Sequence, residues 1–86
     1  MAAYLVVLTP AADRQLAKLP RKAREMVAAA IVTLASNPRP PGAVKLAGAV
    51  DLWRIRVRDY RVIYTVVSGE LIVIVVKIGN RKDVYR

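Results

Sequence analysis

The chain has 86 residues, of which 56% are hydrophobic and 24% are charged, which predicts one globular domain over residues 1–86 and excludes a disordered chain. It contains neither cysteine nor histidine. Disulfides and thiol chemistry are therefore excluded, a zinc site is nearly excluded, and we expect no metal and no cofactor.

Fifteen lysines and arginines stand against six acidic residues, which gives a net charge of +9. Such an excess is typical of proteins that bind nucleic acid, and an acidic partner protein is the alternative. The N-terminus lacks the pattern of a signal peptide, and the longest apolar run, Leu71 to Val76, is too short to cross a bilayer. We therefore expect a cytoplasmic protein that makes no use of a membrane.

The first part of the chain predicts a strand followed by two helices. Tyr4 to Leu8 is a short apolar run rich in β-branched residues, which favours a strand. Thr9 and Pro10 then form a typical helix start, with threonine as N-cap and proline in the first turn. Pro20 interrupts this helix, and apolar residues at helical spacing predict a second helix from about residue 21 to 35. We expect the two helices to form a hairpin that covers a sheet.

The rest of the chain predicts extended structure. Three prolines between Ser36 and Gly42 end the second helix and favour an extended connector. The expected strands are Ala43–Leu46 at a sheet edge, Trp53–Arg58, Arg61–Val67 and Leu71–Ile78, with a hairpin turn at Ser68–Glu70. The predicted fold class is therefore α+β: one strand, a helical hairpin, then three or four antiparallel strands.

The strand from Trp53 to Arg58 has two unlike faces, because apolar and basic residues alternate strictly along it. A period of two turns its arginines to one face and Trp53 to the other, toward a core that we also expect to hold Tyr4 and Tyr64.

The loop after this strand decides where its arginines meet the next strand. If Asp59 and Tyr60 form the loop, Arg58 lies opposite Arg61 and Arg56 lies opposite Ile63. Arg54, Arg56, Arg58 and Arg61 would then share one face, where they repel one another and do nothing for folding. We interpret this face as a site for a polyanion. A structural ion pair between Arg61 and Asp59 is an alternative.

The position of Lys77 depends on the second hairpin. A three-residue loop at Ser68–Glu70 would place Lys77 opposite Arg61 and extend the basic row, whereas a two-residue loop would not. The sequence leaves both registers open.

These residue types suit chemistry on RNA. Single-stranded RNA is bound by cations on its phosphates and by bases stacked on aromatic rings, and Tyr60 and Tyr85 are candidates for the stacking. Arginine stabilises charge on a phosphate well but is a poor proton acceptor, since the pKa of a guanidinium exceeds about 12. The other titratable candidates are Tyr60, Tyr85, Lys77, Lys82, Asp59 and Asp83. The general base stays open, and we expect slow cleavage of free RNA unless a partner orients it.

Taken together, the motifs resemble the RelE toxins of bacterial and archaeal toxin–antitoxin systems over essentially the whole chain. The residues that carry the resemblance are Leu16, Leu19 and Pro20; Leu34, Asn37 and Pro38; Lys45, Leu46 and Gly48; the block from Leu52 to Tyr64; and Val76, Ile78, Gly79, Asn80, Arg81, Val84 and Tyr85. The resemblance is specific to the RelE/ParE superfamily and less specific between its branches.

The resemblance implies a microbial-ribonuclease-like fold and an mRNA interferase that cuts mRNA in the ribosomal A site. The catalytic residues it implies are Arg54, Arg56, Arg61, Arg81 and Tyr85. The RNA-binding candidates are Arg58, Lys77, Lys82 and Tyr60. Arg61 would stabilise the phosphate and Arg81 would assist the leaving oxygen. Tyr85 would stack on or orient the nucleotide, and a part in proton transfer is open to it. The first two catalytic positions are often lysine in the family, so phosphate binding is kept here but a role as general base is weakened.

The resemblance also implies partners. We expect an acidic, partly amphipathic antitoxin that becomes ordered on the toxin in a hetero-oligomer, together with the ribosome and mRNA. Two other functions remain open: a ParE-like toxin that poisons DNA gyrase without cutting nucleic acid, and a degenerate member that only sequesters its antitoxin. The arginines at 54, 56 and 81 and the tyrosine at 85 favour the nuclease.

Overall fold

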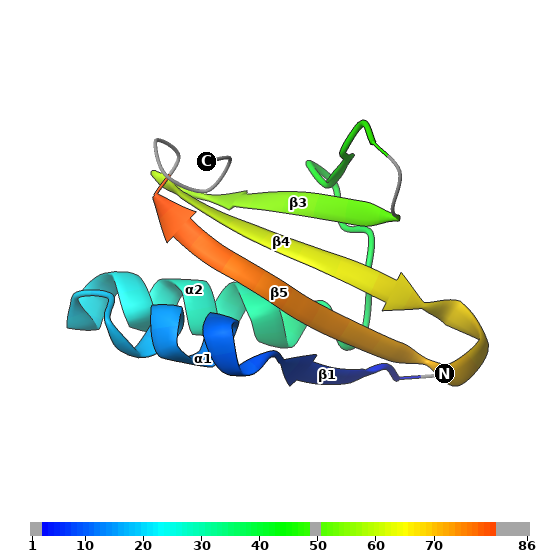
Figure 1. Ribbon diagram of the computed structural model, residues 1–86, viewed down its shortest axis with the longest axis horizontal. Coiled ribbons are helices and arrows are strands. Elements are labelled where there is room, and N and C mark those ends of the chain that lie inside the picture. The colour runs from blue at the N-terminus through cyan, green and yellow to red at the C-terminus, as the bar shows by residue number, and fades with distance from the viewer. Residues whose placement is uncertain (1–2, 49–50, 81–86) are drawn as a thin grey trace.

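A computed structural model describes residues 3–48 and 51–80 and shows a mixed sheet with two helices on one face (Figure 1). The elements in chain order are β1 (Leu5–Leu8), α1 (Pro10–Ala17), α2 (Arg21–Thr33), β2 (Val44–Lys45), β3 (Leu52–Val57), β4 (Tyr60–Val67), a 3-10 turn (Ser68–Glu70) and β5 (Ile72–Asn80). The α+β prediction is confirmed. Within these residues, no helix is long and apolar enough to span a bilayer.

The sheet has five strands in the order β1-β5-β4-β3-β2. Strands β2 to β5 pair antiparallel, as predicted, whereas β1 pairs parallel with β5, from Leu5 opposite Ile72 to Leu8 opposite Val75. The first strand of the chain therefore joins the sheet beside the last described one, and α1 and α2 form the crossover between them.

Local signals set the helix boundaries. The hydroxyl of Thr9 accepts a hydrogen bond from the backbone N–H of Ala12 at 3.1 Å, which caps α1 as predicted. Gln15 ties the same helix to the sheet, because its side-chain oxygen accepts from the N–H of Ile78 at 2.8 Å. Pro20 stands at the N-cap of α2 and makes no side-chain bond there.

The core lies between the helices and one face of the sheet. Its fully buried side chains are Ala12, Val27, Leu34, Val62, Tyr64, Val73 and Val75. Tyr64 also holds the proline-rich connector in place, because its hydroxyl donates to the carbonyl of Pro38 at 2.6 Å. Trp53 and Tyr4 are partly buried against this cluster, which confirms the predicted core positions.

The turn between β3 and β4 differs from the prediction. Arg58 and Asp59 form it, so that Val57 pairs with Tyr60, Arg56 with Arg61 and Arg54 with Ile63. The predicted pairing of Arg58 with Arg61 is therefore wrong. Tyr60 is drawn into the sheet because it pairs on both sides, with Val57 and with Asn80. Arg58 is left in the turn with a positive φ of 54°.

Replacing Arg58 with glycine is expected to stabilise the fold. A left-handed backbone costs a non-glycine residue about 1–2 kcal/mol, and the extra freedom of glycine in the unfolded chain returns about 0.5–1 kcal/mol of that. We expect the free energy of unfolding to rise by about 0.5–1 kcal/mol, measured by urea titration with Trp53 fluorescence. Asp59→Gly is the matched control, since Asp59 does not have a positive φ. Equal destabilisation by both variants would show that the positive φ of Arg58 does not strain the backbone.

Candidate nucleic-acid interface

The basic residues of β3 and β4 occupy the sheet face opposite the helices. The register places them in two rows across neighbouring strands: Arg56, Arg61 and Gly79 in one row, and Arg54, Ile63 and Lys77 in the next. Residues directly opposite each other in an antiparallel pair share a face, so Arg54, Arg56 and Arg61 lie together. Arg56 is exposed, Arg54 is half-buried and Arg61 is buried.

A β-bulge in β5 brings Lys77 to the same face. Tyr64 pairs with Val75, but Ile63 pairs with Lys77, so Val76 is an extra residue with no partner in β4. Continued without the bulge, the register would place Lys77 opposite Val62, on the helix side, and Ile78 opposite Arg61. The bulge therefore sends Ile78 into the core and Lys77 to the arginines. Neither predicted loop length is correct, because Val67 pairs with Ile72 and four residues lie between them. Arg61 pairs with Gly79, as neither alternative stated, yet Lys77 still joins the basic face.

Arg61 is a buried cation without a carboxylate partner among the described residues. The residue has 7% of its surface exposed, its Nη1 donates to the carbonyl of Tyr60 at 3.3 Å, and its Nε has no hydrogen-bond partner. The Nε of Arg54 is also buried and unpartnered. In residues 3–48 and 51–80 the ion pairs are Arg21–Glu25 and Lys45–Asp51, so the alternative pairing of Arg61 with Asp59 is wrong.

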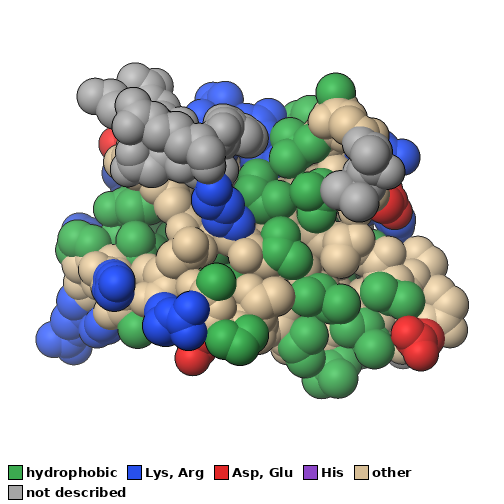
Figure 2. Space-filling view, viewed as in Figure 1, with side chains coloured by type: hydrophobic (Ala, Val, Ile, Leu, Met, Phe, Trp, Pro, Cys, Tyr) green, Lys and Arg blue, Asp and Glu red, His purple; other side chains and the backbone are tan. Residues whose placement is uncertain are grey.

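The electrostatics of this face favour an anion. A buried guanidinium is costly unless its charge is paired and its N–H groups are bonded. Arg61 instead faces a second cation, Arg56, across the strand pair. In Figure 2, basic side chains lie over β3 and the adjoining end of the sheet and also over the helices, whereas acidic ones lie at the margins of the view. A phosphate would supply the missing acceptors through short, charge-assisted hydrogen bonds.

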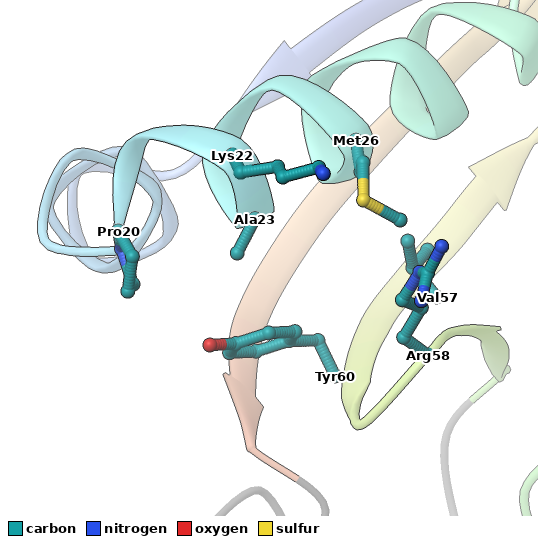
Figure 3. A pocket seen from close by; sticks show the side chains of 7 residues that line it. All are labelled: Pro20, Lys22, Ala23, Met26, Val57, Arg58 and Tyr60. Carbon is teal, nitrogen blue, oxygen red and sulfur yellow. The ribbon is translucent and has the colours of Figure 1, made fainter.

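Two predicted RNA-binding residues lie elsewhere. Arg58 and Tyr60 line a cavity of about 380 Å³ between the start of α2 and the hairpin end of β3 and β4 (Figure 3). The other lining residues are Pro20, Lys22, Ala23, Met26 and Val57. Tyr60 points to the helix side because it pairs with Val57, one residue out of phase with the arginines. The Tyr60 ring extends beneath α2 toward Pro20, and Arg58 rises toward Met26.

The remaining predicted site residues, Arg81, Lys82 and Tyr85, lie outside the described residues. The last described residue, Asn80, pairs with Tyr60, directly after Gly79 in the row of Arg56 and Arg61. Sequence reasoning missed Val76. No local signal marks it, because residues 71 to 76 are all apolar and show no alternation that a bulge would break. It also missed the cavity, which no local pattern indicates.

Comparison with known proteins identifies the class. Residues 6–85 match the family described as the ParE toxin of type II toxin–antitoxin systems. A RelE-like toxin protein of Escherichia coli is 33% identical over 86 residues, which cover 95% of this chain and 90% of that protein.

Solved structures show the same fold. A chain of the archaeal RelE–RelB complex of Pyrococcus horikoshii superposes with a TM-score of 0.82 at 28% identity, covering 94% of this chain and 98% of that one. A chain of the RelBE2 toxin–antitoxin complex of Mycobacterium tuberculosis gives 0.83 at 25%, covering 96% and 97%. A chain of the intact RelBE complex of E. coli gives 0.79 at 29%, covering 91% and 96%.

The basic sheet face, the helical hairpin and the family match define a toxin of a type II toxin–antitoxin system. The chain belongs to the RelE/ParE superfamily of such toxins, and within it the chain is RelE-like.

Proposed function

We propose that this protein is a ribosome-dependent endoribonuclease that cuts mRNA in the A site and so inhibits translation in the cytoplasm. The observation that supports the proposal is the environment of Arg61. This residue is buried, has no carboxylate partner in the described part of the chain, and lies opposite Arg56 on the sheet face away from the helices. A scissile phosphate fits such a site. The likeness to RelE toxins supports the same function.

The reaction is a transesterification that needs no metal. The 2′-oxygen attacks the neighbouring phosphorus, the bond from phosphorus to the 5′-oxygen breaks, and a 2′,3′-cyclic phosphate remains on one fragment. The 2′-hydroxyl gives up one proton, and the leaving 5′-oxygen takes up one. Arg56 and Arg61 stabilise the charge that builds on the phosphoryl oxygens between these events. Arg81 assists the leaving oxygen, and Tyr85 orients the nucleotide.

Removal of the proton from the 2′-hydroxyl is the step that this site supports least well. An arginine keeps its proton at neutral pH, so neither Arg54 nor Arg56 accepts one from the 2′-hydroxyl. Catalysis then depends on charge stabilisation and on holding the 2′-oxygen in line with the phosphorus. The ribosome supplies that alignment by fixing the codon in the A site, which is why free RNA is a poor substrate.

A cell-free translation reaction tests the proposal. Primer extension on a translated message should show new 5′ ends when the wild-type protein is added, and the matching upstream fragments should end in a cyclic phosphate. The Arg61→Ala and Arg81→Ala variants should remove these ends, and Arg14→Ala, on the exposed surface of α1, should keep them. A wild-type protein that makes no cuts, or cuts that survive both variants, would contradict the nuclease.

Poisoning of DNA gyrase is the second candidate, because the family match over residues 6–85 is to ParE toxins. The ParE-like function predicts that the purified protein blocks supercoiling by gyrase and leaves translated mRNA whole. The two assays therefore separate the two functions. A protein that is silent in both is the degenerate member that only binds its antitoxin.

An acidic, partly amphipathic antitoxin is the proposed protein partner in a hetero-oligomer. The net charge of +9 supplies the electrostatic complement, and Leu5 and Val7 of β1 expose 62% and 38% of their surface on the arginine side of the sheet. Figure 2 shows apolar side chains gathered over β1 and the adjoining sheet. Co-expression should give one complex whose antitoxin gains helix or strand signal in circular dichroism on binding.

A further inference from the structure

We propose that Lys77 and Arg54 form a second phosphate seat, which holds the RNA backbone one nucleotide away from the scissile phosphate at Arg56 and Arg61. The inference rests on the proposed function, since it assigns a further subsite on the same face. It follows from three features of the sheet: the bulge at Val76, the row that contains Ile63, and the spacing of the two rows.

The bulge is the first step, because it is what places a lysine on this face. β-bulges bend a strand and re-aim its side chains, and they are frequent beside functional sites. Here the extra residue Val76 lets Ile78 enter the core while Lys77 stays on the side of the arginines. Two consecutive residues of one strand therefore reach opposite sides of the sheet: Ile78 lies in the core and Lys77 lies on the basic face.

The row through Ile63 is the second step. Ile63 lies between Arg54 and Lys77 in the register, on the face away from the helices. It has only 4% of its surface exposed although it is absent from the helix-side core cluster. Arg54, beside it, is half-buried, and its Nε is withdrawn from solvent. Two cations therefore flank an apolar floor.

The spacing is the third step. The backbones of Arg54 and Lys77 are two strand widths apart, which is about 10 Å. Both side chains are long enough to reach a phosphate that lies between them. The row of Arg56 and Arg61 is two residues along β3 and β4, about 7 Å away. One nucleotide of an unstacked backbone spans such a step, so neighbouring phosphates can occupy the two seats. The RNA then runs along the strands rather than across them.

The test measures how binding of a short fluorescein-labelled single-stranded RNA depends on salt. Each phosphate contact on a single strand contributes about 0.7 to the slope of log affinity against log salt concentration. Lys77→Met keeps the aliphatic stem and removes the charge, so the slope should fall by about 0.7 between about 50 and 200 mM salt. Lys77→Arg should restore it. Lys18→Met, at the exposed C-cap of α1, should leave it unchanged.

A second readout separates this inference from the proposed function. On translating ribosomes, Lys77→Met should raise the toxin concentration for half-maximal cleavage, while the rate at saturation stays within about twofold of wild type. An unchanged salt slope in Lys77→Met, with cleavage still lost in Arg61→Ala, would overturn the second seat and leave the nuclease standing. If the wild-type protein makes no cuts at all, the proposed nuclease function is wrong, and this result is distinct from a failure of the second phosphate seat alone. Lys77→Gln provides a second neutral variant if the methionine variant folds poorly by circular dichroism.

Discussion

The Arg61→Met variant is expected to lose RNA cleavage by about 100- to 1000-fold and to become more stable at the same time. Loss of one preorganised group that stabilises transition-state charge has this cost in other enzymes. The gain in stability has a separate cause: the variant removes a buried charge that lacks a carboxylate partner in the described residues and keeps a side chain of similar length. Replacing buried charge by well-packed apolar groups is often neutral or stabilising.

Two measurements on one preparation check this prediction. The cleavage rate on translating ribosomes should fall, and the free energy of unfolding in urea should rise by about 1 kcal/mol or more. Arg14→Met is the control, since Arg14 is an exposed arginine of α1, and it should change neither quantity. If Arg61→Met loses stability together with activity, the guanidinium has a structural role and the argument from its burial is wrong.

The second large effect is expected at Tyr64, and it falls on stability. Tyr64 is fully buried between the sheet and α2, and its hydroxyl donates to the carbonyl of Pro38. Truncation to alanine should cost about 3–5 kcal/mol, because it leaves a cavity in the core. The total free energy of unfolding of a domain of this size is about 4–13 kcal/mol, so much of the Tyr64→Ala protein should be unfolded near 37 °C.

The Tyr64→Phe variant is the matched, graded control. It keeps the ring and removes only the hydroxyl, which leaves the Pro38 carbonyl without its donor at a cost of about 1–3 kcal/mol. Urea titrations followed by Trp53 fluorescence should rank wild type above Tyr64→Phe and Tyr64→Phe above Tyr64→Ala. Equal losses in the two variants would show that the hydrogen bond, and not the packing of the ring, dominates.

The same hydroxyl gives a pH signature. Burial raises the pKa of Tyr64 above its ordinary value near 10, and the positive charge of Arg39 opposes part of that rise. The unfolded chain releases this proton near pH 10, whereas the folded protein holds it to higher pH. The stability it contributes is therefore complete below about pH 10 and is lost as the pH rises through the raised pKa. The difference in stability between wild type and Tyr64→Phe should shrink above about pH 10.

The sequence predicts well whatever depends on local periodicity. Strict alternation placed Arg54 and Arg56 on one face, and the Thr9-Pro10 pair marked the start of α1, both as observed. Arg61 also lies on the same face as Arg54 and Arg56, as predicted, although the predicted register was off by two residues. A shift of two residues leaves every side chain on the same face of the sheet.

What depends on pairing between distant segments could not be predicted. Arg58 was assigned to the strand, but Tyr60 gains partners on both sides only if Arg58 enters the turn. The facing of Lys77 depends on a bulge whose position is fixed by how Val75 and Ile78 meet the helices. The parallel pairing of β1 with β5 joins segments more than sixty residues apart, and no local signal encodes it.

The place of β5 in the sheet has a consequence for synthesis. It is made after every other described strand, yet β1 and β4 both bond to it, so neither sheet nor core can close before it emerges. A nascent chain that ends before Ile72 has helices without a complete surface to cover and lacks Lys77 altogether. The chain must therefore be made at least to the end of β5 before the sheet and the core can close around the helices.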